Sequence, residues 1–562
     1  MKTYVLKRLI LSMINFSSAN RIQILQEAQS EIFDLVIIGG GITGAGIALD
    51  AASRGLSVLL LEKDDFASGT SSRSTKLIHG GLRYLKQLEF NIVRQVGKER
   101  AILYQNAKHL IRPEPMLLPI IEGGSLGKLS TKLGLWLYEF LAGVPIHEQK
   151  RMLNSNECNQ AEPLMDKAII RGGALYTEYR TDDARLTITV LKTAIKLSAK
   201  AVNHAAVIDL VYDDGKIKGV RVQEKLSGTE FQILAHTVVN AAGPWVDEIR
   251  LKEGPLFGKK LHLTKGIHLV VHHKRFALKQ AVYFDSSDKR MIFAIPRNGC
   301  TYIGTTDTDY IGNKSNPPIS VVDVQYLLDA CNRIFPTIHL SQNDVISSWS
   351  GLRPLIHEDG KSPSELSRKD ELFVSPSGLI SIAGGKLTGY RLMAKRVVDV
   401  IALKLNSKEH RLIPKSRTHE LKLSGGDFID EQDIIEFKDI LCGQAKQVNC
   451  TYNKIDEWVN RYGKDAEHIV EIAFALWPEI SEKEWLPDIA EMHYAIHHEM
   501  CLHPSDYYVR RTSNLYFNRE NLKRKFDTLY PWFVQIAQLN IENAKQFEEQ
   551  FINEIDLALD FK

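Results

Sequence analysis

The sequence predicts a mixed α/β protein whose C-terminal part is helical. Near the N-terminus, the segment 33–55 reads as a strand, a glycine-rich turn and a helix. Strand-like segments dominate 233–307, after a predicted hairpin at 205–223 that turns at Asp-Asp-Gly. After Pro414 the pattern becomes helical and more charged. A chain of 562 residues exceeds one ordinary core, so two or three domains are expected.

The N-terminal unit carries glycines at the spacing G-x-G-x-x-G. Gly39, Gly41 and Gly44 follow the apolar run 35–38. In this pattern the first glycine allows a tight turn, the second lets a pyrophosphate approach the main chain, and the third lets the helix pack against the strand. The unpaired N–H groups at the start of the helix favour the negative charge of phosphates. The spacing therefore predicts a Rossmann-like dinucleotide site.

Three further segments support this site. A second apolar run, 57–61, ends at Glu62, the position at which an acidic side chain binds a ribose hydroxyl. The segments 237–248 and 378–401 each place small residues after an apolar strand, which would let a flat ligand lie against the backbone. Either segment could be an ordinary strand end. Their occurrence in this order after the glycine motif makes that alternative weaker.

Bulk properties exclude several classes of protein. Lys and Arg number 71 against 68 Asp and Glu, which indicates a globular protein, not a nucleic-acid binder or a disordered chain. The six cysteines form no C-x-x-C pair, so no disulfide framework, zinc site or iron–sulfur cluster is expected. His493 and His497 have the spacing of a metal pair without a third ligand, and no metal is predicted. The basic and aromatic segment 506–533 is assigned to packing of the C-terminal domain instead of RNA binding.

Residues 1–30 are expected to form an N-terminal extension that is helical from about Ser18. No apolar run reaches the roughly 18 residues that span a bilayer. The patch that follows Lys7 and Arg8 lacks a small-residue cleavage site, so an intracellular protein is expected. The sequence leaves open whether Met13 is the start.

From Glu31 to about Phe533 the chain resembles the FAD-dependent, aerobic glycerol-3-phosphate dehydrogenases of the glycine/D-amino-acid oxidase-like flavoproteins. The segments that carry the resemblance are the first βαβ unit, SSRSTKLIHGGLRYL (71–85), VNAAGPWVD (239–247), SGLRPL (350–355), AGGKLTGYR (383–391) and DYYVRRTSNLYF (506–517). The resemblance implies a Rossmann-like FAD-binding domain interleaved with a β-rich substrate-binding domain over 31–415, the substrate part being mainly 110–180 and 255–345. A helical C-terminal domain would occupy 416–562.

The resemblance also implies which residues contact FAD. The ADP half would lie against Gly39, Gly41, Gly44 and Glu62, and the flavin half against Ser72, Lys76 and Leu77, with Gly385, Leu387 and Thr388 on the far side of the ring. The chain departs from the commoner Thr-Thr pair of the family by having Gly389 after Thr388. This departure puts the local geometry of the turn in doubt.

The implied reaction takes a hydride from C2 of glycerol 3-phosphate to FAD and a proton from its hydroxyl, while the phosphate dianion is held in place. Phosphate binding calls for arginine or lysine donors, and the resemblance assigns it to Arg83, Tyr84 and Lys386. Arg353 would stabilise the developing alkoxide, and His268 is the first candidate for the base. Loop arginines are ordinarily solvated, and a strand histidine is ordinarily a core residue. Glycines beside these arginines and Lys386 favour a site.

The resemblance implies a membrane quinone as electron acceptor and a cytoplasmic protein held peripherally on the inner face of the cell membrane; it also allows a homodimer. Candidates for membrane contact are Leu133, Leu135, Trp136, Leu137, Tyr138, Phe140 and the basic C-terminal run. A buried amphipathic helix explains either segment equally well. Two alternatives remain: a glycerol-3-phosphate oxidase that uses O2 and gives H2O2, and a non-catalytic flavin-binding protein. The short span between the motifs of Arg353 and Lys386 favours the dehydrogenase.

Overall fold

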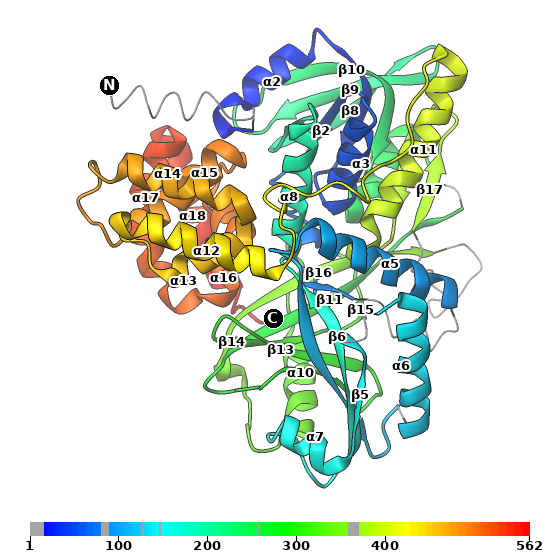
Figure 1. Ribbon diagram of the computed structural model, residues 1–562. Coiled ribbons are helices and arrows are strands. Elements are labelled where there is room, and N and C mark those ends of the chain that lie inside the picture. The colour runs from blue at the N-terminus through cyan, green and yellow to red at the C-terminus, as the bar shows by residue number, and fades with distance from the viewer. Residues whose placement is uncertain (1–15, 80–88, 126, 145–147, 257, 358–369) are drawn as a thin grey trace.

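The computed structural model describes residues 16–562 apart from 80–88, 126, 145–147, 257 and 358–369. Figure 1 shows three parts: an upper part built on one sheet, a lower part built on a second sheet, and a helical C-terminal part at one side of both. The predicted mixed α/β class with a helical C-terminal domain is confirmed.

The first sheet has a parallel centre. Its strands, in spatial order, are β17 (Glu371–Val374), β18 (Ile380–Ala383), β10 (Glu230–Asn240), β1 (Ile32–Ile38), β2 (Val58–Leu61) and β7 (Lys200–Val202), with β9 (Lys216–Glu224) and β8 (Ala205–Asp213) added beside β10. Apart from Ile32, β1 is buried throughout, as expected of a strand between parallel neighbours. The predicted hairpin is confirmed: β8 and β9 are antiparallel, and Asp214 and Gly215 both have the positive φ of a type I′ turn.

Helices pack on this sheet, and one of them ties the start of the described chain to it. α3 (Ile42–Ser53) contacts both α8 (Asp183–Lys196) and α11 (Tyr390–Glu409). The Tyr390 ring packs directly against Gly46 of α3. A Cβ at this position would lie only 2.7 Å from the ring, so the close packing requires glycine. At the start of the described chain, α2 (Arg21–Ala28) is tied to the sheet by a buried ion pair between Arg21 and Glu224 at 2.8 Å.

The second sheet is mostly antiparallel. Its strands, in order, are β15 (Thr308–Asp309), β11 (Lys260–His272), β14 (Cys300–Gly304), β13 (Met291–Arg297), β12 (Ala281–Asp285), β4 (Arg112–Ile121), β6 (Ile170–Arg180) and β3 (Leu77–Ile78), with β16 (Val345–His357) beside β11 and β5 (Arg151–Leu153) beside β6. Alternate residues of β11 enter different cores: Leu269 packs with α10 (Val321–Ile334), and Val270 joins the core of the C-terminal helices. This sheet therefore lies between two hydrophobic layers.

The C-terminal part is a bundle of helices with its own core. Its helices are α12 (Glu431–Ala445), α13 (Tyr452–Tyr462), α14 (Ala466–Leu476), α15 (Leu486–His498), α16 (Asn514–Phe517), α17 (Leu522–Ala537) and α18 (Ile541–Leu557). Tyr507, Tyr508 and Phe526 are buried in that core, so the predicted packing role of 506–533 is confirmed. Arg510 and Arg511 of the basic C-terminal run are buried as well, whereas its Lys523 and Arg524 are exposed, so membrane contact by this run stays a prediction.

The segment 128–144 forms α6 (Lys128–Ala142), which packs against α5 (Phe90–Asn106). Its candidates for membrane contact divide by face, since Leu135 and Tyr138 are buried and are wrong candidates, whereas Leu133, Trp136 and Phe140 are exposed. Leu129 extends the same exposed row, and Leu137 is half-buried.

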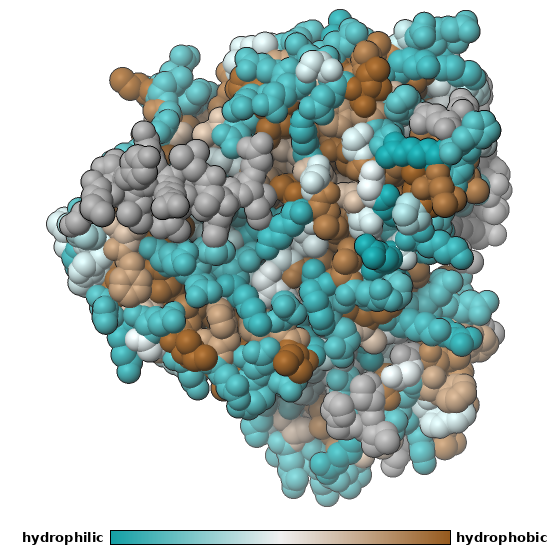
Figure 2. All heavy atoms as spheres, turned by 45° about the horizontal axis from the view of Figure 1, so that its top comes forward, coloured by the Kyte–Doolittle hydropathy of each residue, from teal (hydrophilic) through white to brown (hydrophobic). Residues whose placement is uncertain are grey.

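Elsewhere, Figure 2 shows a mainly hydrophilic surface with small separate hydrophobic groups on the face in view. None of the helices in the described ranges combines the length and apolarity needed to cross a bilayer. All six cysteines are free thiols.

Candidate functional site

A cavity of about 480 Å³ opens where the parallel strands of the first sheet end. Because the carboxyl ends of parallel strands meet at one edge, the turns that follow β1, β10 and β18 come together there. The lining includes Gly39 and Gly41 from the first turn, Ala241–Trp245 after β10, and Gly384–Leu387 after β18. Three segments that the sequence singles out are thus brought to one place.

The glycines of the first turn have different tasks. Gly39 has a φ of +109°, and a Cβ there would lie 2.7 Å from the Ala241 carbonyl oxygen. A Cβ on Gly44 would lie 1.9 Å from the Gly39 carbonyl oxygen, so this glycine lets α3 pack against the turn. At Gly41 the nearest described atom is Ser71 Oγ, at 3.2 Å. Gly41 therefore keeps the cavity open beside the N-terminus of α3, a position that suits a pyrophosphate.

Glu62 stands at the tip of β2 and lines the same cavity. Its two oxygens accept hydrogen bonds from the backbone N–H groups of Gly40, at 2.6 Å, and Asp64, at 2.9 Å. Burial, followed by the negative charge of Asp64, raises the pKa of Glu62 to about 7. Ribose hydroxyls would donate to this carboxylate, so the residues present fit the ribose and phosphates of a dinucleotide.

The residues predicted near the flavin divide into lining and supporting positions. Gly385 and Leu387 line the cavity, and so does Lys386 between them. Ser72, Lys76 and Leu77 are buried beside it without lining it. Lys76 Nζ lies 2.6 Å from Asp183 Oδ1, and Asp183 itself lines the cavity.

Thr388 ties the turn after β18 to the end of β3. It is buried, and its hydroxyl donates to the carbonyl oxygen of His79 at 3.3 Å. His79 directly precedes the segment that carries Arg83 and Tyr84, and these two predicted phosphate ligands lie outside the described residues. The turn of Lys386 and His79 are therefore neighbours.

Arg353 and His268 lie on neighbouring strands at one end of the second sheet, β16 and β11. β16 and β11 are antiparallel, and the Arg353 guanidinium occupies the space above Gly266, where a Cβ would be 2.3 Å from its nearest nitrogen. Nη2 donates to Thr305 Oγ1 at 3.0 Å, and Nη1 donates to the Thr306 carbonyl oxygen at 3.1 Å. His268 is two residues along β11 on the same face as Gly266.

The His268 ring is enclosed. It stacks on Trp349 with centroids 4.8 Å apart, and its Nε2 lies 2.9 Å from Thr75 Oγ1. Gly304 makes room for the ring, since a Cβ there would approach it to 2.1 Å. Burial is the largest cause that holds the pKa of His268 well below its usual range, and the charge of Arg353 lowers it further. His268 is therefore neutral near pH 7.

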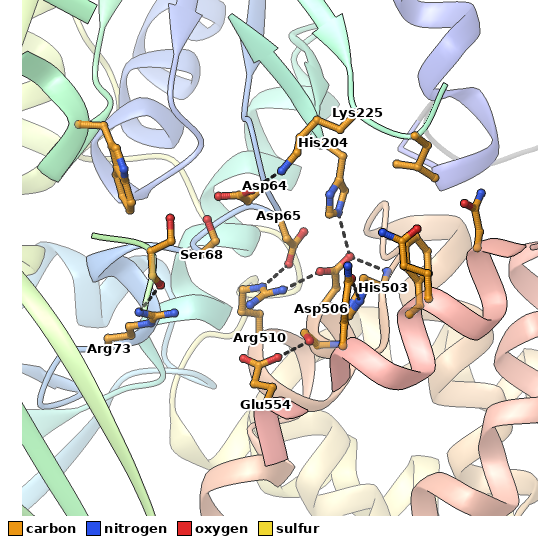
Figure 3. Close-up of a pocket in the computed structure, with 18 residues that line it drawn as sticks. Asp64, Asp65, Ser68, Arg73, His204, Lys225, His503, Asp506, Arg510 and Glu554 are labelled. Carbon is orange, nitrogen blue, oxygen red and sulfur yellow. Dashed lines mark hydrogen bonds and ion pairs between the residues drawn. The ribbon is translucent and has the colours of Figure 1, made fainter. Parts of the chain in front are cut away.

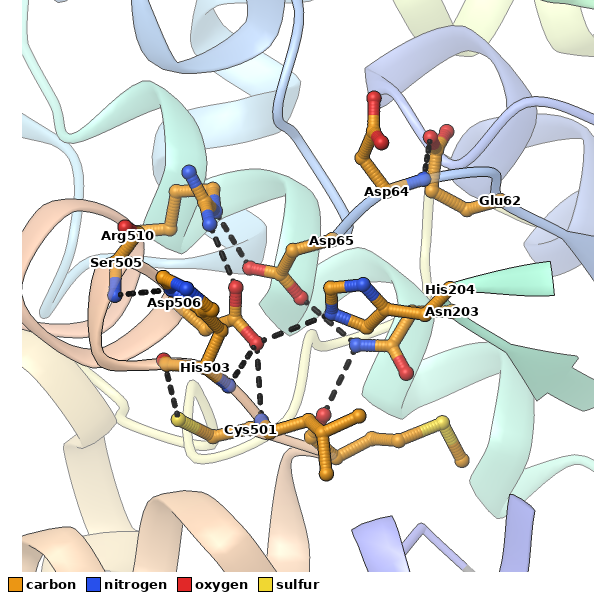
Figure 4. A network of polar contacts seen from close by, with 12 residues as sticks. Glu62, Asp64, Asp65, Asn203, His204, Cys501, His503, Ser505, Asp506 and Arg510 are labelled. Carbon is orange, nitrogen blue, oxygen red and sulfur yellow. Dashed lines mark hydrogen bonds and ion pairs between the residues drawn. The ribbon is translucent and has the colours of Figure 1, made fainter. Parts of the chain in front are cut away.

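A polar network joins the loop after β2 to the C-terminal domain (Figures 3 and 4). Asp65 accepts hydrogen bonds at 2.6 Å from both Arg510 and Arg511. Asp506 accepts from Arg510 at 2.6 Å and lies 3.3 Å from His204. Asp65, His204 and Asp506 are close enough to share a metal ion. However, both carboxylates are already paired with arginine, so we describe the network as an ion-pair clamp between the domains.

Several lining residues escape the sequence analysis. Ser71, Ser74 and Trp245 line the cofactor cavity beside residues that the sequence predicts as contacts or within a predicted segment, and Asp183 lines it as well. Asp183 opens a helix more than a hundred residues after the glycine motif, and no local signal marks it. Gly266 carries a usable signal, because a glycine inside a strand often marks a close approach by another group.

Two family models match the chain. One, described as FAD dependent oxidoreductase, matches residues 34–391, and one described as the C-terminal domain of alpha-glycerophosphate oxidase matches 416–531. The chain is 46% identical over 541 residues to the aerobic glycerol-3-phosphate dehydrogenase of Bacillus subtilis, covering 96% of this chain and 97% of that protein. It is also 46% identical over 552 residues to the enzyme of that name from Staphylococcus saprophyticus, covering 97% and 98%.

Solved structures give a similar result. The glycerol-3-phosphate dehydrogenase from Bacillus halodurans, complexed with FAD, is similar with a TM-score of 0.83 and 41% identity, covering 97% of this chain and 99% of that chain. The L-alpha-glycerophosphate oxidase from Mycoplasma pneumoniae, with FAD bound, has a TM-score of 0.54 and 16% identity over 69% of this chain and 97% of that chain, which shows a shared fold alone.

Proposed function

Because the chain belongs to the aerobic, FAD-dependent glycerol-3-phosphate dehydrogenases, we propose that it oxidises sn-glycerol 3-phosphate to dihydroxyacetone phosphate and passes the electrons to a membrane quinone. The oxidation and the FAD cofactor are those of the family. The observation that carries the proposal for the site is the Arg353 guanidinium, which lies above Gly266 beside His268. The next residue, Pro354, lines the cofactor cavity.

Bound FAD supplies the hydride acceptor, and the chain supplies its cradle. Gly41 leaves room for the pyrophosphate at the start of α3, and Glu62 accepts hydrogen bonds from the ribose hydroxyls. Gly385 and Leu387 would hold the far side of the ring. Lys76, paired with Asp183, fixes the loop behind the cavity.

The substrate is held by its phosphate and oriented by its hydroxyl. We assign phosphate binding to Lys386 together with Arg83 and Tyr84, which follow His79 in the sequence, and His79 lies next to the Lys386 turn. Arg353 would point at the C2 oxygen and stabilise the charge that develops there, because a fixed guanidinium needs no reorganisation during the reaction. Neutral His268 is the assigned base, and the Thr75 hydroxyl that contacts its Nε2 would pass the proton to it.

An anaerobic absorbance experiment tests the proposal. The purified protein is expected to be yellow, to lose its colour on addition of glycerol 3-phosphate, and to regain it quickly with a quinone analogue but slowly in air. The match of the C-terminal domain to that of an oxidase makes the oxidase the second candidate. Fast recovery in air would favour the oxidase, and a yellow protein that the substrate never bleaches would contradict both. Size-exclusion chromatography of the same sample tests the homodimer.

We propose that the exposed row of α6 is the surface that contacts the membrane from the cytoplasmic side. Leu129, Leu133, Trp136 and Phe140 follow one another at intervals of one helical turn, and each is more than half exposed. The rings of Trp136 and Phe140 are stacked 6.0 Å apart. Large exposed apolar side chains on one helix face are typical of an interfacial helix.

Replacing Trp136 and Phe140 together by Gln is expected to weaken binding to lipid vesicles about tenfold or more, since each buried aromatic side chain contributes roughly 1.5–3 kcal/mol. Flotation with vesicles of the bacterial lipids phosphatidylglycerol and cardiolipin measures the effect. The matched control replaces Ile311 and Leu412, which are exposed outside α6, by Gln. Equal loss in both double variants would contradict a specific role for α6.

A further inference from the structure

A second, smaller cavity lies between the second sheet and the C-terminal domain. Its volume is about 150 Å³. One wall comes from the ends of β4, β6 and β13, and the other from α13 and residues 511–513; Figure 1 shows the helical domain beside this sheet. Among the described residues, none lines both this cavity and the cofactor cavity. Nothing in the proposed reaction uses this space.

The lining of this interdomain cavity is rich in arginine. It contains six arginines and three carboxylates: Arg112, Arg180, Arg185, Arg297, Arg461, Arg511, Asp182, Asp456 and Glu457. Several of the arginines are neutralised by buried acids. Arg185 pairs with Glu499 at 2.5 Å, and Arg297 pairs with Asp182 at 2.9 Å. Within the described chain, however, Arg112 makes no ion pair, and its side chain donates only to the amide oxygen of Asn460.

Arg112 and Arg180 lie opposite each other on the adjacent strands β4 and β6. They are direct partners in the antiparallel register of β4 and β6, so their side chains project from the same face of the sheet. Like charges placed directly opposite each other destabilise a sheet. Arg180 is partly relieved by Glu114, 3.3 Å away. Burial lowers the pKa of Arg112, the charge of Asp456 offsets part of this shift, and the charge of Arg180 lowers the pKa further. An anion between the two guanidinium groups would remove the repulsion.

Two buried polar side chains on the same cavity lack partners. His109 is 1% exposed, and neither of its ring nitrogens has a hydrogen-bond partner among the described residues. Thr181 is 2% exposed, and its hydroxyl is likewise unpartnered there. Burial is the main cause that lowers the pKa of His109 to about 3, so its ring is neutral and offers one N–H. Buried donors without acceptors are unfavourable unless a ligand or water satisfies them.

We propose that this cavity binds a small oxyanion, namely inorganic phosphate or the phosphate group of a small metabolite. Arginine forks match phosphate oxygens, and the donors of His109 and Thr181 complete the set. The volume is below the roughly 300 Å³ of pockets that hold drug-sized ligands. A bound oxyanion would bridge Arg112 of the sheet to the C-terminal domain, and so would stabilise the folded protein as its concentration rises.

Equilibrium dialysis of the FAD-loaded protein with labelled inorganic phosphate tests the proposal. Wild type is expected to bind one phosphate more per chain than Arg112→Gln. Thr181→Val keeps every charge and loses only an unpartnered hydroxyl, so it should fold normally and bind that phosphate several-fold more weakly. Arg171→Gln is the matched control, since Arg171 lies on β6, the strand that pairs with β4, but is exposed and outside the cavity. Unchanged phosphate binding in both Arg112→Gln and Thr181→Val would overturn the proposal.

A second experiment distinguishes free phosphate from a phosphorylated metabolite, and the interdomain cavity from the substrate site. Lys386→Gln weakens the assigned substrate site but leaves the interdomain cavity intact. This variant should therefore still bind the phosphate that Arg112→Gln does not bind. If glycerol 3-phosphate displaces it, the ligand class is a phosphorylated metabolite, and if not, it is the free ion. Thermal unfolding should agree: phosphate is expected to raise the Tm of wild type more than that of Arg112→Gln, with sodium chloride at equal ionic strength as the control.

Discussion

Arg353→Ala is expected to lower kcat by a factor of about 100 to 1000 while FAD stays bound, because removing one preorganised donor from a developing oxyanion has this effect in enzymes. Arg353 does not line the cofactor cavity, and it is held in place by Thr305 and Thr306 at 3.0 and 3.1 Å. The fold should tolerate the change, since the guanidinium is partly exposed. Steady-state kinetics with a quinone analogue and the flavin spectrum measure the two quantities.

Arg353→Lys is the matched variant for this experiment. It keeps the positive charge but loses the planar fork that contacts two threonines, so an intermediate rate is expected. Loss of the yellow colour in Arg353→Ala would mean that this residue supports FAD and not the substrate. A kcat within a fewfold of wild type would remove Arg353 from the reacting centre.

Gly41→Val is expected to fold but to bind no FAD. Gly41 has a φ of −75°, which every residue can adopt, and an added Cβ would touch only Ser71 Oγ, at 3.2 Å, among the described atoms. The new side chain would therefore fill the cavity beside the N-terminus of α3 without displacing backbone. The ratio of flavin to protein absorbance and the far-ultraviolet circular dichroism of the purified variant measure cofactor and fold separately.

Gly44 supplies the contrasting case. A Cβ at Gly44 would lie 1.9 Å from the Gly39 carbonyl oxygen, so Gly44→Val should fail to fold at all. If Gly41→Val is yellow, the pyrophosphate does not pass Gly41, and the placement of the cofactor is wrong. If both variants misfold alike, Gly41 serves packing and not ligand access.

The sequence predicts the parts of the fold that local patterns encode. The glycine spacing, the buried apolar strands and the turn at Asp214 and Gly215 each follow from backbone requirements that a short segment reveals. Which leucines of α6 are exposed was not predictable in this way, since it depends on packing against distant elements, which covers Leu135 and leaves Leu133 exposed.

The site was predicted less completely, for a physical reason. Glu62 and Gly41 belong to one local motif, whereas Asp183 reaches the cavity through pairing of elements far apart in the chain. The ion pair of Lys76 with Asp183 depends on that pairing, and no spacing rule marks it. The assignments of Arg83 and Tyr84 rest on resemblance and stay predictions.

The clamp of Asp65 also bears on how the protein is made. Asp65 leaves the ribosome early, but its partner Arg511 lies 446 positions later. The first sheet is likewise completed only by β18, at 380–383. During synthesis a negative charge that is buried in the finished protein must therefore stay hydrated until nearly the whole chain has emerged. The described lining of the cofactor cavity is likewise complete only once Leu387 has been made, so FAD capture is expected late in synthesis.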